Sequence, residues 1–82
     1  MRRAMIVCHS QTEALKCVRL LEGAGVGGTL RKPPRDKIDN SCAWGVRIRA
    51  GDLFNARRRM QEKNFCPSRI YEYDDMCDRR GL

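Results

Sequence analysis

The residues of this chain that could do chemistry are its five cysteines, Cys8, Cys17, Cys42, Cys66 and Cys77. Their number is odd and no two of them are spaced as CxxC, so the pattern does not predict a disulfide framework. The sequence lacks the paired Cys or His residues that would predict a structural zinc site, although distant cysteines could share a metal ion. We therefore expect reduced thiols, most of them buried.

Cys42 has the sequence context of a reactive residue. It lies between a polar, turn-forming segment and an apolar run, so its thiol can be exposed to solvent. Arg35, Lys37, Arg47 and Arg49 are near it in the sequence, and cations beside a thiol favour the thiolate, which is the nucleophile. Such a cysteine could attack a donor persulfide and present the bound sulfur to an acceptor. The alternative is an ordinary cysteine at the edge of a strand.

The other cysteines have weaker claims to reactivity. Cys8 lies in an apolar run and Cys17 on an apolar helical stripe, so both are expected to be small core residues. Cys66 lies in a predicted loop and Cys77 near the C-terminus, and either could act as a second thiol. His9 could serve as a base or as a hydrogen-bond donor, although a single histidine is more often structural.

No familiar catalytic motif occurs in the chain. A P-loop, a GxGxxG fingerprint, a Ser/His/Asp set and an HExxH motif are all absent from the sequence. The sequence therefore favours a carrier or accessory protein over an enzyme, and it predicts no cofactor.

The charge of the chain is strongly basic, with 17 Lys and Arg against 10 Asp and Glu. This excess indicates an acidic partner or anionic substrate, and a solvated basic surface is the alternative. Only two Phe, two Tyr and one Trp accompany the charge, which argues against a stacking platform for nucleic acid. No apolar run approaches the roughly 20 residues that span a bilayer, and the apolar N-terminal run is too short for a secretory signal. We expect a cytoplasmic protein.

The elements that must position these residues begin with an apolar strand over residues 5–8. Ser10 and Glu13 then form a capping box, in which the hydroxyl accepts from the Glu13 amide and the carboxylate from the Ser10 amide. The helix that follows has an apolar stripe of Ala14, Cys17, Val18 and Leu21, widened by Leu20 and Ala24. Gly23 and Gly25 can adopt the left-handed conformation that ends it.

The rest of the chain predicts three more strands, over residues 27–31, 43–48 and 68–73, and a second helix from residue 51. Alternation in the third strand puts Trp44, Val46 and Ile48 on one face. The three arginines at 57–59 fall on the polar side of the second helix, where Arg58 and Glu62 form an i,i+4 pair.

The order βαββαβ predicts the α+β ferredoxin-like plait, with two helices on one face of a four-stranded antiparallel sheet. Residues 1–73 form the single domain on this interpretation. Residues 74–82 are predicted to be a charged, loose tail.

The sequence also resembles the "putative selenium/sulfur carrier-like" family of small domains, over about residues 5–73. The resemblance starts at residues 8–15, a capped helix opening that also occurs in many other proteins. Its specific part is Pro34-Arg35 followed, at the right distance, by Ser41-Cys42. Ala43 is a departure, because the family has glycine after the cysteine.

The resemblance implies a small accessory protein that carries sulfur or selenium on Cys42, as a persulfide or selenopersulfide. Arg35 and Arg47 would stabilise the bound anion, with Ser41, Pro34 and His9 around it. A sulfur or selenium donor or acceptor, such as a cysteine desulfurase, would be the partner. The resemblance does not distinguish sulfur from selenium.

Two other functions remain open at this point. A non-catalytic interaction or regulatory module could use the basic surface and an edge strand to bind a protein, and the same edge could form a homodimer. Nucleic-acid binding is favoured by charge alone and is the weaker alternative.

Overall fold

The computed structural model describes residues 2–37 and 41–74 and has the element order that the sequence predicts. The strands are β1 (Arg2–Cys8), β2 (Thr29–Arg31), β3 (Trp44–Arg49) and β4 (Arg69–Asp74). The α-helices are α1 (Gln11–Glu22) and α2 (Leu53–Glu62), and the 3₁₀ turns are η1 (Arg35–Lys37) and η2 (Ala50–Asp52).

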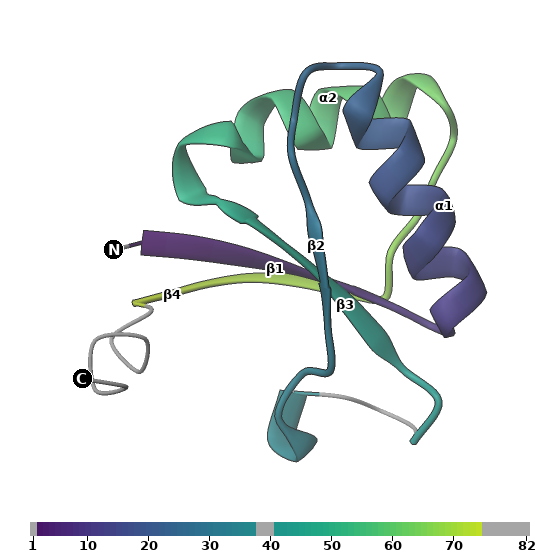
Figure 1. Ribbon diagram of the computed structural model, residues 1–82, viewed down its shortest axis with the longest axis vertical. Helices are drawn as coiled ribbons and strands as arrows, with labels where there is room; N and C mark the ends of the chain where they lie inside the picture. The colour runs from purple at the N-terminus through teal and green to yellow at the C-terminus, as the bar shows by residue number, and fades with distance from the viewer. Residues whose placement is uncertain (1, 38–40, 75–82) are drawn as a thin grey trace.

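The four strands form one antiparallel sheet in the order β2-β3-β1-β4. Both α-helices lie against the same face of this sheet, and no helix of the described residues covers the other face (Figure 1). This arrangement confirms the predicted ferredoxin-like plait. No helix in residues 2–37 and 41–74 is long and apolar enough to cross a membrane.

The main core lies between the sheet and the helices. Alternate residues of β1 and β3 point to the helices, including Ile6 and Ile48, which are fully or almost fully buried. They pack against the predicted stripe of α1, where Ala14, Cys17 and Leu21 are buried. Val18 and Leu20 are only half-buried, and Ala24, after the end of the helix, is exposed. The alternation predicted for the third strand is therefore confirmed.

The start of α1 differs slightly from the predicted capping box. The Glu13 amide donates to the Ser10 hydroxyl at 3.2 Å, as expected. The Glu13 carboxylate, however, reaches one residue further back and accepts from the His9 amide at 3.2 Å. At the other end, Gly23 keeps helical angles, and Gly25, with φ of 76°, is the left-handed residue that turns the chain.

The arginine run on α2 divides between solvent and the helix interface. Arg58 and Glu62 form the predicted ion pair at 3.7 Å on the exposed side. Arg59 is half-buried and donates from Nε to the carbonyl of Leu20 at 3.1 Å, which ties α2 to α1. The three arginines therefore do not form a uniformly solvent-exposed face, because Arg59 also donates a hydrogen bond to a carbonyl near the end of α1.

The predicted strand boundaries move by only one to three residues. β1 begins at Arg2, earlier than predicted, because β3 and β4 pair with it on both sides. β4 includes Asp74, the first residue of the predicted tail. The rest of that prediction, residues 75–82 with Cys77, lies outside the described residues.

Two leucines of α1 offer a matched test of this packing. Leu21 is fully buried and Leu15 is 43% exposed. We expect Leu21→Ala to lower the free energy of unfolding by about 2–5 kcal/mol, because it leaves a cavity in the core. Leu15→Ala should lower it by less than about 1 kcal/mol, since it removes little buried surface. Urea denaturation measures both, and equal losses would contradict the assignment of the core face.

Candidate functional site

Several chain segments meet at one end of the sheet, which we call the cysteine end. Cys8, the last residue of β1, pairs with Trp44, the first residue of β3, so Cys42 and His9 leave the sheet at the same end. The Ser68 amide donates to the carbonyl of Val7 at 2.8 Å, which brings the loop before β4 to this end as well.

Cys42 is exposed, in a turn with Ser41, which is exposed too. The next residue, Ala43, is only 2% exposed and packs with Met5 and Val7 on the helix-free face of the sheet. The alanine in place of the family's glycine is thus a buried anchor, and it does not bury the thiol beside it.

Lys32, the residue directly after β2, holds this turn. Its Nζ donates to the carbonyl of Ser41 at 2.6 Å and to the carbonyl of Ala43 at 2.7 Å. The same ammonium group lies 5.5 Å from the centre of the Trp44 ring, within cation–π range. One positive charge therefore binds the two carbonyls on either side of Cys42.

Sequence reasoning missed Lys32, which is ten residues from Cys42. The only signal that could have found it is the register of the β2–β3 hairpin, where Arg31 pairs with Gly45. Continuing that register by one residue puts Lys32 opposite Trp44. The register depends on the glycine-containing turn before β2 and the proline-containing turn after it. The sequence pattern alone does not give the geometry of these turns.

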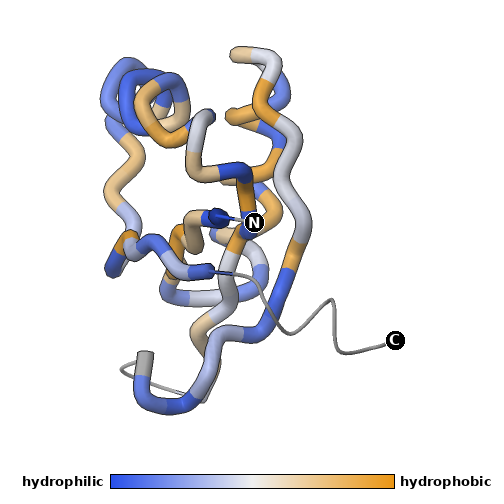
Figure 2. The backbone as a smooth tube through the Cα atoms, turned by 90° about the vertical axis from the view of Figure 1, so that its left-hand side faces the viewer, coloured by the Kyte–Doolittle hydropathy of each residue, from blue (hydrophilic) through white to orange (hydrophobic). Residues whose placement is uncertain are grey.

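The structure does not gather all the predicted site residues around Cys42. Arg47 lies in the middle of β3 opposite Met5, roughly 10 Å along the strand from Trp44 at about 3.3 Å per residue. Half of the strand thus separates it from the turn. Pro34, just before η1, and Arg35, the first residue of η1, are both exposed and lie on the chain that leads to the turn. Figure 2 shows this connection between β2 and β3 as a largely hydrophilic stretch at the lower end of the molecule.

His9 is exposed and contacts Glu13, with 3.1 Å between Nδ1 and Oε1. The hydrogen bonds from the His9 side chain and amide lower the pKa of Glu13 below its ordinary value of 4.5. The geometry makes His9 part of the cap of α1. Its role toward Cys42 stays a prediction.

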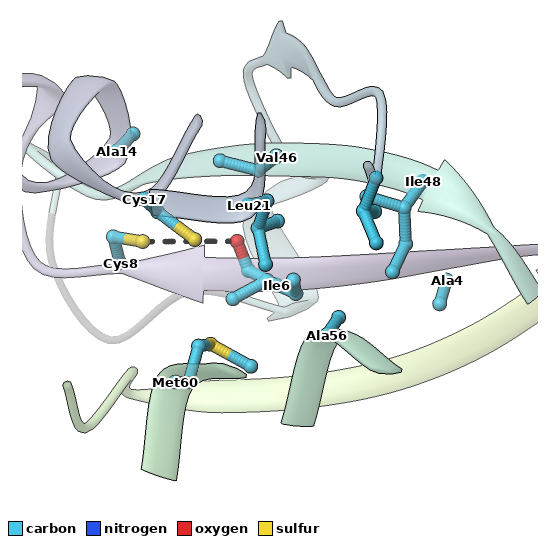
Figure 3. Packing of buried hydrophobic residues seen from close by; sticks show 11 residues of the cluster. Ala4, Ile6, Cys8, Ala14, Cys17, Leu21, Val46, Ile48, Ala56 and Met60 are labelled. Carbon is cyan, nitrogen blue, oxygen red and sulfur yellow. Dashed lines mark hydrogen bonds between the residues drawn. The ribbon is translucent and has the colours of Figure 1, made fainter. Parts of the chain in front are cut away.

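Cys8 and Cys17 form a buried pair of thiols between β1 and α1 (Figure 3). The Cys8 thiol also points to the carbonyl of Ile6, at 3.9 Å. The hydrogen bond with Cys17, and then burial, raise the pKa of Cys8 far above its ordinary value, so it stays protonated. The expectation that these two cysteines are core residues is confirmed.

Cys66 is the second exposed cysteine among the described residues. It lines a hollow of about 550 Å³ together with Arg57, Arg69 and apolar groups of Met60 and Ile70. This concave setting was not visible in the sequence, because α2 and β4 build it together. Residues 2–37 and 41–74 contain no cluster of three or more His, Cys, Asp or Glu that could hold a metal ion.

Comparison with known proteins gives one match. The model of the family described as "Putative Se/S carrier protein-like" matches residues 3–72, which is most of the chain. No curated protein and no solved structure matches.

The contact of Lys32 predicts a change in the mobility of the turn. Replacing Lys32 by Met removes hydrogen bonds to two carbonyls, and a charged hydrogen bond contributes roughly 1.5 kcal/mol, or about tenfold in a local opening equilibrium. Amide hydrogen exchange over residues 41–44 should therefore become about tenfold faster. Lys16→Met, on the exposed side of α1, is the control and should leave this exchange unchanged. Equal exchange in wild type and Lys32→Met would show that the clamp does not order the turn.

The pairing of His9 with Glu13 predicts a pH dependence. Because the folded-state pKa of Glu13 is depressed, its contribution is present above the unfolded-state pKa and is lost as pH falls through the folded-state pKa. Between about pH 6 and about pH 3, wild type should lose more stability in urea denaturation than Glu13→Gln. Glu22→Gln, at the other end of α1, should lose as much as wild type, and a loss in Glu13→Gln equal to wild type would disprove the assignment.

Proposed function

We propose a carrier function from one premise, that this chain belongs to the Se/S carrier-like family. In this proposal Cys42 accepts a sulfur or selenium atom from a donor protein, holds it as a persulfide or selenopersulfide, and delivers it to an acceptor. The general idea of a sulfur or selenium carrier comes from the family, and the use of Cys42 is our own inference from the chain.

The observation that carries the proposal is the exposed thiol in a turn that is held on both sides. The carbonyls of Ser41 and Ala43 share the ammonium group of Lys32, and Ala43 is anchored in an apolar cluster. A carrier needs a thiol that reaches two successive proteins in one defined position. An exposed residue between two anchored neighbours meets that requirement, and buried Cys8 and Cys17 do not.

The transfer step is a thiol exchange without net oxidation. The Cys42 thiolate attacks the outer sulfur of a persulfide on the donor, and a new S–S bond forms at Cys42. The donor's own S–S bond breaks, and its electron pair leaves with the donor's thiolate. Delivery repeats the step, as an acceptor nucleophile takes the outer atom and Cys42 leaves as a thiolate. A cysteine desulfurase is the type of donor that supplies such a persulfide.

The structure changes which cation we propose beside the carried anion. Lys32 places an ammonium group at the backbone of the turn, and we propose it as the cation that favours an anion there. Arg35, exposed in η1, remains in the proposal as a cation that meets the donor. Arg47 does not, since β3 carries it away from the turn. The Cys42 thiol must be reduced before it can accept a sulfur or selenium atom, and thiols stay reduced in the cytoplasm, so we place the protein there.

Cys42 and Cys66, the two exposed cysteines of the described residues, make the test a matched one. Incubation with a cysteine desulfurase and cysteine should add the mass of one sulfur atom to the wild-type chain, measured by intact mass spectrometry and located by peptide mapping. We expect Cys42→Ser to lose at least nine-tenths of this adduct, because it removes the nucleophile. Cys66→Ser should keep it. An adduct retained in Cys42→Ser and lost in Cys66→Ser would transfer the role to the hollow between α2 and β4.

A further inference from the structure

The helix-free face of the sheet carries an aromatic pair. Tyr71 and Tyr73 are on β4, and both are partly exposed. Their ring centres are 5.8 Å apart, and the rings pack against a small cluster that contains Met5 and Val7. The only two tyrosines of the chain thus lie side by side on the face that the helices leave open.

Arginines from all four strands share this face with the tyrosines. Arg3 pairs with Tyr73, and Arg69, on the strand that carries the tyrosines, pairs with Val7. The others lie further across the sheet, and they are Arg47 and Arg49 on β3 and Arg31 on β2. Arg31, Arg49 and Arg69 are exposed, whereas Arg3 and Arg47 are half-buried. Five of the 17 basic residues of the chain therefore occupy one side of one sheet.

Two of these arginines stand directly opposite one another, since Arg3 pairs with Arg49 across β1 and β3. Like charges directly opposite in a sheet destabilise it. Tyr73 continues the same row, because it pairs with Arg3 on the other side. A row that joins two cations and an aromatic ring fits a ligand that has both negative charge and a flat ring.

A hollow of about 540 Å³ lies beside this row, and we call it the arginine notch. It is lined by Arg3, Arg47, Arg49, Asp52, Ile48, Thr29 and the glycines 25, 27 and 28. The notch exists because β2 pairs with β3 only as far as Arg47, so the end of β3 has no strand on the side away from β1. The α1–β2 loop that borders the notch lies at the top of Figure 1, whereas η1 lies at the bottom.

Gly27 in the notch has no packing reason to be glycine. A Cβ atom there would meet nothing within 4 Å, and its φ is not in the left-handed region. Glycine leaves the backbone of this loop open to close approach by a ligand. Asp52 is the carboxylate of the notch, against three arginines.

We infer that this face binds single-stranded nucleic acid, with backbone phosphates on the arginines of the notch and bases stacked on Tyr71 and Tyr73. Guanidinium groups match phosphate oxygens in pairs, and aromatic rings on a sheet stack unpaired bases. The net charge of +7 attracts the same ligand over longer range. The notch lies at the opposite end of the sheet from the Cys42 turn, whereas the tyrosines rest on the cluster that also holds Ala43. Neither the phosphate contacts nor the stacking uses the Cys42 thiol.

The placement of the aromatic residues answers the objection that the sequence raised. Five aromatic residues in 82 are few, but stacking needs only two on the right face. Double-stranded nucleic acid and an acidic peptide would also meet the arginines. Neither offers unpaired bases to the tyrosines, so neither explains the row of Arg49, Arg3 and Tyr73.

The experiment measures binding of a short fluorescein-labelled oligouridylate to the full chain by anisotropy, at several salt concentrations. Wild type should bind, with affinity that falls as salt rises, and should bind the duplex form of the same length at least tenfold more weakly. Arg49→Gln should weaken binding and reduce the salt slope by about 0.7, the value for one phosphate contact on a single strand. Arg58→Gln on α2 changes the net charge equally and should leave the slope unchanged.

Tyr73→Leu tests the stacking part and keeps an apolar side chain on the cluster. It should weaken oligouridylate binding roughly tenfold at an unchanged salt slope, since a stacked base contributes about 1–3 kcal/mol. Gly27→Leu, which adds a side chain in open space, should weaken binding without loss of stability in urea denaturation.

Three results would overturn the inference. They are no binding at low salt, equal binding of single and double strands, and an equal effect of Arg49→Gln and Arg58→Gln. If a labelled poly-glutamate peptide bound as tightly as the oligonucleotide, the face would be a surface for acidic proteins instead. Cys42→Ser should bind the oligonucleotide as wild type does, so failure here and failure of sulfur carriage can be told apart.

Discussion

The pairing of β1 with β3 is the interaction on which the rest of the structure depends. Six residues of each strand pair, from Arg3 with Arg49 to Cys8 with Trp44. Because side chains alternate along a strand, this one register decides which residues meet the helices and which stay on the open face. A shift by one residue would move Ile48 out of the core and Arg47 into it. The buried apolar face excludes such a shift.

The same register places the Cys42 turn at one end of the sheet and the arginine notch at the other. The turn is held by Lys32, the residue directly after β2, and by the burial of Ala43. The notch is open because β2 is only three residues long. One short edge strand therefore positions a cation at the first region and leaves space for the second.

Gly45 shows how closely the open face is packed where it has no helix. A Cβ atom at this position would lie 2.5 Å from the sulfur of Met5 and 3.2 Å from the carbonyl of Arg31. The glycine lets Met5 cover β3, and Met5 in turn supports Tyr71 and Tyr73. The small apolar cluster that anchors Ala43 is thus the same one on which the tyrosines rest. This one cluster supports both the Cys42 turn and the tyrosine pair.

The sequence by itself determined the elements, the plait and the buried faces, whereas it indicated only that Cys42 could be exposed. Each of these follows from local patterns, such as the capping residues Ser10 and Glu13 or the alternation from Trp44 to Ile48. Only the tertiary structure decided which residues lie next to one another in space. Lys32 came to the turn, Arg47 stayed away from it, and the tyrosines met the arginines because strand pairing joins residues that are far apart in sequence. Periodicity reports the face on which a residue lies, whereas its partner across the sheet depends on a register that the whole core sets.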